Sequence, residues 1–179
     1  MLIDAAGPNE VEIASSYGFK KVITLLELMT LYPSLSPLGI YDFFMSEQYY
    51  KQVHQAVLSR YGMTADELRS QLQFSAIVII HGTFKTLSFV QIVLDIASSV
   101  DGTLLGKKRQ SAADPQPVKI FSTDPDLLWA SDWPNPRLGA RVINIMVQET
   151  FKAVYGFDLE VEMIGKPYDF IFSYVEDQL

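Results

Sequence analysis

The sequence of 179 residues contains no cysteine. This absence excludes disulfides, thiolate nucleophiles and zinc sites built on thiolates. Basic residues are also few: 14 Lys and Arg stand against 21 Asp and Glu, which gives a net charge of −7. Nucleic-acid binding requires a basic surface, so we expect no nucleic-acid partner.

Long apolar runs are missing as well. The run at 76–80, Ala-Ile-Val-Ile-Ile, is far shorter than the ~20 residues that a membrane-spanning helix needs. The N-terminus lacks the basic and apolar segments of a signal peptide. We therefore expect no membrane partner and an intracellular protein, with which the lack of cysteine is compatible. The sequence begins with the apolar residues Met1-Leu2-Ile3, which we interpret as a strand that starts abruptly in a partial chain.

The sequence does contain β-branched runs that alternate with segments of helical apolar spacing, and this alternation predicts an α/β fold. Predicted strands cover residues 19–24, 76–80, 118–122 and 159–164. Predicted helices cover 8–17, 46–60, 87–98, 140–155 and 168–178, and a capping box at 64–67 opens one more. We expect the first three strands to share one sheet. The segments 32–39 and 103–117 are predicted loops, the second with the basic run 107–109 in solvent.

Few residues outside these elements carry recognisable chemistry. There is no glycine-rich phosphate loop, and the two histidines, His54 and His81, are not at metal-ligand spacing. His54 falls in the middle of a predicted helix and is interpreted as an ordinary surface or boundary residue. His81 follows the strand 76–80, at a position where open α/β sheets often bind ligands. The ordinary alternative, a histidine that touches no ligand, is favoured for His81.

Two short segments follow predicted strands and leave alternatives open. Asp124-Pro125-Asp126 has the paired carboxylates that attack a phosphoryl group and shuttle a proton in Mg²⁺-dependent phosphatases. Asp and Pro also build ordinary turns at strand ends, which is the favoured alternative. In Gly165-Lys166-Pro167, the lysine could balance phosphate charge or be a loop lysine.

Three segments in this order resemble the eukaryotic branch of subclass IIA of the haloacid-dehalogenase-type (HAD) hydrolases. They are 122–129 (Ser-Thr-Asp-Pro-Asp-Leu-Leu-Trp), Pro136-Arg137-Leu138-Gly139 and Gly165-Lys166-Pro167. Residues 7–24 and 91–102 also resemble the first strand and helix and the central helix of the family's cap domain. The family usually has Asn at the position of Asp124, and its Gly-Gln-Gly-like segment reads Leu138-Gly139-Ala140-Arg141 here.

The resemblance implies a C2-type cap domain at residues 1–157 and a return into a Rossmann-like core at 158–179. It makes Lys166 the catalytic residue of this chain and implies substrate contacts for Asp124, Asp126 and Arg137. It implies no metal ligand and no cofactor for the chain alone, because the nucleophile and the Mg²⁺-binding motif would lie outside it.

The resemblance also implies what the complete protein does. That protein would be a Mg²⁺-dependent phosphatase, mitochondrial in location, that acts on a small phosphorylated substrate through an aspartyl-phosphate. This chain would be inactive by itself. Two alternatives stay open: a non-catalytic binding module derived from the cap, and a minimal phosphatase with Asp124 as nucleophile. Whether the chain is an enzyme, and whether it forms a homodimer, is also open.

Overall fold

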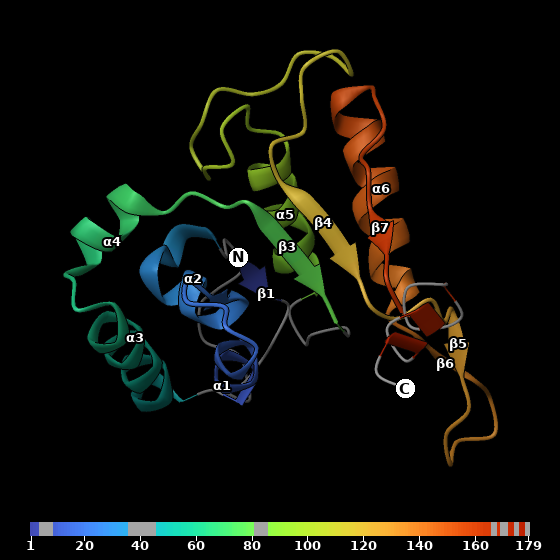
Figure 1. Ribbon diagram of the computed structural model, residues 1–179, viewed down its shortest axis with the longest axis horizontal. Coiled ribbons are helices and arrows are strands. Elements are labelled where there is room, and N and C mark those ends of the chain that lie inside the picture. The colour runs from blue at the N-terminus through green and yellow to red at the C-terminus, as the bar shows by residue number, and fades with distance from the viewer. Residues whose placement is uncertain are drawn as a thin grey trace.

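The computed structural model describes residues 1–3, 9–35, 46–80, 86–165, 168, 172–173 and 176–177. Its centre is a five-stranded sheet in the order β2-β1-β3-β4-β7, with parallel pairing between all neighbours (Figure 1). The strands are β1 Leu2–Ile3, β2 Ile23–Thr24, β3 Ala76–Ile79, β4 Lys119–Ser122 and β7 Glu162–Met163. The predicted α/β class is therefore confirmed, and the strands predicted within 19–24, 76–80 and 118–122 share one sheet.

The helices form two groups around this sheet. They are α1 Asn9–Ser16, α2 Leu25–Leu31, α3 Glu47–Tyr61, α4 Ala65–Gln71, α5 Thr86–Ala97 and α6 Arg141–Tyr155, with a 3-10 turn at Pro33–Leu35. Figure 1 shows α1 to α4 gathered on the side of the sheet where β1 lies, while α5 and α6 run beside β3 and β4 and contact each other. Each predicted helix that falls within the described residues is present, apart from the segment 168–178, of which only short pieces are described.

Local signals set the helix ends. The Ser46 hydroxyl accepts a hydrogen bond from the Tyr49 amide at the start of α3, and the helix ends at Gly62 with a left-handed φ of 64°. Thr64 and Glu67 form the expected reciprocal capping box at the start of α4. His54 lies within α3, as predicted, and is half-buried.

Helix α2 was not predicted from the sequence, although its start carries a signal. Thr24 ends β2 and also caps α2: its hydroxyl accepts from the Glu27 amide, and the Glu27 carboxylate accepts from the Thr24 amide. This is a capping box. The helix itself has no polar face, because every residue from Leu25 to Leu31 is buried. The apolar period that reveals an amphipathic helix is therefore missing.

The predicted strands 19–24 and 159–164 are longer than the strands observed there, β2 and β7. Both observed strands lie at the edges of the sheet. In β2, only Ile23–Thr24 pair, and Phe19 is 52% exposed. In β7, only Glu162–Met163 pair with β4. An edge strand has one neighbour, so fewer of its residues are held in a ladder.

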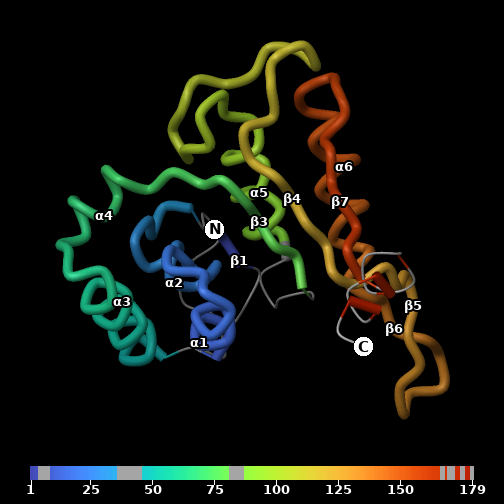
Figure 2. The backbone as a smooth tube through the Cα atoms, in the orientation of Figure 1, coloured from blue at the N-terminus to red at the C-terminus, as the bar shows by residue number. Residues whose placement is uncertain are grey.

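The segment 103–117 contains no helix or strand and forms the long connection between α5 and β4 (Figure 2). Part of it is less solvated than the sequence suggests. Arg109 is only 5% exposed, and its guanidinium lies 5.0 Å from the centre of the Phe157 ring. Its Nη2 donates to the Asp114 carbonyl at 3.0 Å. Burial lowers the pKa of Arg109 from its ordinary value. The interpretation of this basic run as a fully solvated loop is therefore wrong for Arg109.

The part of the chain described above contains no helix long and apolar enough to cross a membrane.

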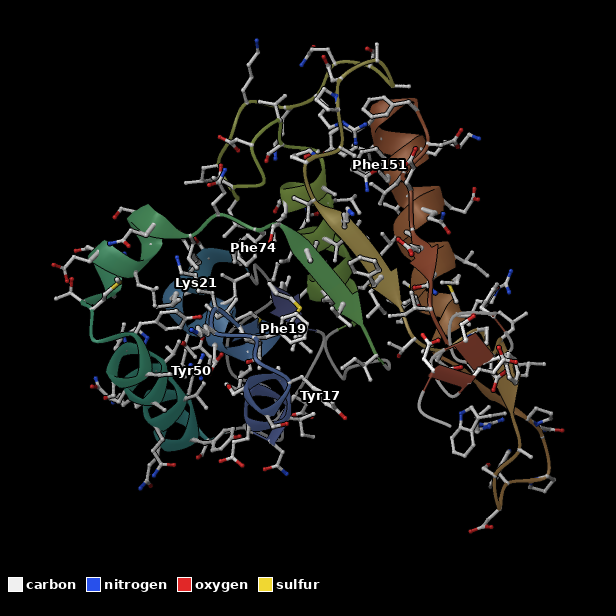
Figure 3. All side chains as sticks on the ribbon, viewed as in Figure 1. Tyr17, Phe19, Lys21, Tyr50, Phe74 and Phe151 are labelled. Carbon is white, nitrogen blue, oxygen red and sulfur yellow. The ribbon has the colours of Figure 1, made fainter. Side chains whose placement is uncertain are left out.

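An ion pair joins α2 to α3. The Glu27 carboxylate accepts from Nη1 and Nη2 of Arg60 at 2.6 and 2.8 Å, and Nη2 also donates to the Val22 carbonyl. The same interface includes a hydrogen bond from the Tyr50 hydroxyl to the Met29 carbonyl; Tyr50 is marked in Figure 3. The side chain of Glu27 is 8% exposed and that of Arg60 33% exposed, so the pair is only partly screened by water.

Replacing Glu27 by Gln should lower the free energy of unfolding by about 2 kcal/mol. This is less than for a fully buried pair, because Arg60 is partly exposed. Gln keeps an oxygen to accept from the Thr24 amide, so the change isolates the ion pair. Urea unfolding measures the effect. The matched control is Glu47→Gln, which breaks the exposed pair of Glu47 with Lys51 on α3. Equal unfolding midpoints for Glu27→Gln and the wild type would contradict a stabilising role for this pair.

Candidate functional site

The carboxyl ends of the five parallel strands lie at one edge of the sheet, where open α/β proteins bind ligands. The chain leaving β4 is fixed there between its two neighbours. The Thr123 amide donates to the Ile79 carbonyl at 3.1 Å, and the Ile164 amide donates to the Ser122 carbonyl at 2.9 Å. The turn 123–126 and the residues after β7 therefore meet at this edge. His81 lies outside the described residues.

Two glycines clamp the turn 123–126. A Cβ on Gly165 would lie 1.8 Å from the Thr123 carbonyl oxygen, and a Cβ on Gly139 would lie 2.0 Å from the Asp126 carbonyl oxygen. These separations are far below van der Waals contact, so any other residue would displace the backbone. The structure thus brings Gly139 and Gly165, from two of the segments that carry the family resemblance, against the turn 123–126 in the remaining one.

Asp124 takes part in the structure of this turn. One of its carboxylate oxygens accepts a hydrogen bond from the Asp126 amide at 2.8 Å, which is an Asx-type turn. Asp124 is half-buried and Asp126 is exposed. The Asp126 carbonyl accepts from the Arg141 amide at 3.3 Å, where α6 begins. The interpretation of residues 124–126 as an ordinary turn accounts for the hydrogen bond that Asp124 accepts. The substrate-binding roles of Asp124 and Asp126 stay predictions.

Arg137 lies on a hairpin that the sequence did not predict. Strands β5 Leu128–Trp129 and β6 Arg137–Leu138 pair in antiparallel fashion, and Figure 1 shows them extending beyond the end of β4. We call residues 127–138 the arm. The Nε of Arg137 donates to the Asn135 carbonyl at 3.1 Å, and its guanidinium lies 5.9 Å from the centre of the Trp133 ring. These contacts of Arg137 are within the arm, and its predicted role towards substrate stays a prediction.

Lys166, the predicted catalytic residue, lies outside the described residues. Its neighbour Gly165 is described, and the Gly165 carbonyl accepts from the Tyr168 amide at 3.0 Å. Tyr168 is 38% exposed and Phe172 is 55% exposed.

A buried polar contact under the turn was missed by the sequence analysis. The Nδ2 of Asn144 donates to the Ser122 hydroxyl at 2.7 Å, and it lies 3.5 Å from the Met163 sulfur. Asn144 is 3% exposed and Ser122 is fully buried. This contact ties α6 to β4 and β7. The available signal was a polar residue on the apolar stripe of the helix, which otherwise contains Ile143, Val147 and Phe151.

The described residues do not form a magnesium site. Among them, no three His, Cys, Asp or Glu side chains gather closely enough to hold a metal ion. Magnesium is bound through several oxygen ligands, so Asp124 and Asp126 alone do not fit it. A pocket of about 100 Å³ lies at the opposite edge, where Met1, Lys21 and Phe74 line it near the starts of strands (Lys21 and Phe74 are marked in Figure 3). It shares no lining residue with the turn.

The fold is that of an α/β protein with a parallel sheet. Comparison with known proteins finds relatives that are named as hydrolases. No family model matches the chain. The chain is 23% identical over 168 residues to a Saccharomyces cerevisiae protein named mitochondrial hydrolase YKR070W, a match that covers 91% of the chain and 44% of that protein.

A second relative is a Schizosaccharomyces pombe protein named cardiolipin synthase (CMP-forming) / mitochondrial hydrolase fusion protein. The chain is 29% identical to it over 90 residues, which are 50% of the chain and 15% of that protein. The matches therefore span less than half the length of both relatives.

Gly165→Ala should separate β7 from the turn. The added methyl would collide with the Thr123 carbonyl, so we expect a loss of about 2 kcal/mol in the free energy of unfolding. We also expect faster hydrogen exchange at the Ile164 amide, whose hydrogen bond to Ser122 must lengthen. Urea unfolding and exchange measured by NMR test both effects.

The matched control is Gly156→Ala at the end of α6. Gly156 has a left-handed φ of 81° and open space around it, so alanine there costs about 1 kcal/mol through backbone conformation alone. Unchanged exchange at Ile164 in Gly165→Ala would show that the close approach does not exist.

Proposed function

We propose that this chain is part of a HAD-type hydrolase that catalyses phosphoryl transfer in a longer protein. The observation that carries the proposal is the match over 168 residues to a protein named mitochondrial hydrolase. The convergence of the segments at Asp124, Gly139 and Gly165 on one sheet edge supports it. Both relatives carry the words mitochondrial hydrolase, which supports a mitochondrial location for this protein.

In this proposal the chain contributes the cap and one catalytic cation. Lys166 follows Gly165, whose backbone is packed against the turn at Thr123. A lysine fixed beside this edge would stabilise negative charge that develops on a phosphoryl group, more strongly than it stabilises reactants in water. Asp124, Asp126 and Arg137 would contact the substrate. The nucleophilic aspartate and the carboxylates that bind Mg²⁺ would come from other parts of the longer protein.

A second proposal is a non-catalytic binding module that keeps the cap without the chemistry. The Asp124 carboxylate already accepts from the Asp126 amide, as expected for a structural turn. The arm also presents large apolar side chains to solvent, which is common at binding surfaces. The two proposals differ in what Lys166 does, and the experiments below separate them.

The isolated chain should show no hydrolysis of an aryl phosphate in the presence of Mg²⁺, because the proposed nucleophile lies elsewhere. A colorimetric assay of the released phenol measures this. Turnover that survives Lys166→Ala but disappears in Asp124→Asn would contradict the proposal. It would establish the chain as a minimal phosphatase with Asp124 as nucleophile.

A chimera tests the hydrolase proposal directly. This chain would replace the matched segment of the Saccharomyces cerevisiae protein, after that protein has been shown to hydrolyse an aryl phosphate. We expect the chimera to retain hydrolysis and Lys166→Ala to reduce kcat by at least about 100-fold, a typical loss for a group that stabilises transition-state charge. Lys119→Ala is the control, since Lys119 is an exposed lysine of β4.

A folded chimera without activity, or one whose kcat is unchanged by Lys166→Ala, would overturn the hydrolase proposal in favour of the binding module. Circular dichroism establishes whether each chimera is folded. The Lys119→Ala chimera should match its parent in both kcat and KM.

A further inference from the structure

The buried polar contact under the turn 123–126 joins the start of α6 to the sheet. Asn144 is in the first turn of α6, and its Nδ2 donates to the Ser122 hydroxyl at 2.7 Å. Ser122 is the last residue of β4, immediately before the turn. At the other end of the turn, the Asp126 carbonyl accepts from the Arg141 amide at 3.3 Å. The start of α6 is therefore bonded to the chain on both sides of the turn.

The same side chain reaches the strand that leads to Gly165. The Asn144 Nδ2 lies 3.5 Å from the Met163 sulfur, and the amide of the next residue, Ile164, donates to the Ser122 carbonyl. Asn144 thus contacts β4 just before the turn and β7 just before Gly165. These are the two segments in which the proposed function places substrate binding and the catalytic lysine.

Asn144 is poorly suited to a role in stability alone. It is 3% exposed, and among the residues that the structure describes its Oδ1 has no hydrogen-bond partner. A buried acceptor without a partner costs at least as much free energy as one neutral hydrogen bond contributes. A leucine at this position would have no polar group to satisfy. It would also match the other buried residues of α6, which are Ile143, Val147 and Phe151.

We propose that Asn144 is a positioning residue of the proposed active site, an inference that rests on the proposed hydrolase function. Its hydrogen bond to Ser122 fixes one arrangement of β7 relative to the turn. Apolar contacts are not directional, whereas a buried polar pair can select one arrangement among several of similar energy. Lys166 follows Gly165 directly, so a shift of β7 would displace the proposed catalytic cation. A displacement of about 1 Å can lower a catalytic rate by about 100-fold.

The test removes both polar groups of the contact together, in the double variant Ser122→Ala, Asn144→Leu. Replacing both partners of a buried hydrogen bond by apolar groups changes stability little, so we expect a urea unfolding midpoint close to that of the wild type. In NMR spectra of this chain, the nuclear Overhauser effects from the Gly165 Hα protons to the Asp124 amide should weaken. The amide signals of both residues should broaden, because β7 and the turn then exchange between arrangements.

The same double variant in the chimera with the Saccharomyces cerevisiae protein separates kcat from KM. We expect kcat to fall at least about tenfold, because the proposed lysine acts on the transition state. KM should change less than about threefold, because the turn keeps the bond from the Thr123 amide to the Ile79 carbonyl. Ser122→Ala alone should also lower kcat. It removes a single oxygen, so it decides the question if the double variant does not fold.

The matched control is Gln148→Leu, the same kind of change about one helical turn further along α6. The Gln148 Nε2 donates to the Leu159 carbonyl at 3.2 Å, so this side chain also joins α6 to another part of the chain. Its partner precedes β7, at the end of that strand away from Gly165. The control should keep the Overhauser effects from Gly165 and the kcat of the parent chimera, even if its unfolding midpoint is lower.

Two results would overturn the proposal. One is a folded double variant that keeps either the Overhauser effects from Gly165 or the kcat of its parent, which would make Asn144 a structural residue only. The other is a Gln148→Leu variant that loses both to the same extent, because the loss would then not be specific to the contact under the turn. A parent chimera without activity would contradict the hydrolase function alone, and the NMR comparison would still decide whether Asn144 positions β7.

Discussion

The close packing of one turn between two glycines is the constraint on which the proposed site depends. The backbone at 123–126 touches Gly165 on one side and Gly139 on the other, at separations that no side chain would permit. Below the turn, Asn144 donates to the buried hydroxyl of Ser122 and lies against Met163. Unpaired polar groups are costly in a core, so this contact favours a single arrangement of α6, β4 and β7. The turn therefore has little freedom to move relative to the end of β7.

This constraint places the segments proposed for catalysis and for substrate binding at the same edge of the sheet. The Gly-Lys-Pro segment begins where Gly165 meets the turn, and the arm leaves the other end of that turn at Leu127. A parallel sheet alone does not specify an activity, because many functions share such folds. The proposal of a hydrolase rests on the similarity to two proteins named as mitochondrial hydrolases, and the geometry explains why separate segments of the chain would act together.

The central strands and most described helices could be predicted from the sequence, because the signals for them are local. Runs such as 76–80 are β-branched and apolar, and Ser46 and Thr64 mark helix starts. The failures have a common cause in contacts that are distant in sequence. Helix α2 is buried on all sides, so it shows no amphipathic period. The arm strands have two residues each, and their pairing depends on how the hairpin closes.

The candidate site was likewise predictable only where its signals are local in the sequence. The positions of the Asp124 and Gly165 segments after strands could be read from the sequence, but their contact could not. It arises because β7 pairs with β4, a choice of neighbour that no local pattern records. Likewise, the burial of Arg109 depends on Phe157, which is far along the chain. Local sequence patterns were therefore enough to predict the helices and strands. The contacts that build the candidate site also depend on the order of the strands in the sheet, which those patterns do not record.

The most direct test of this account is the nuclear Overhauser effect from the Hα protons of Gly165 in the folded chain. If Gly165 packs against the turn, its Hα protons should show strong effects to the amide proton of Asp124 and to the protons of Thr123. Effects from Gly165 to another strand, or none to these two residues, would contradict the convergence of the two segments and with it the proposed site.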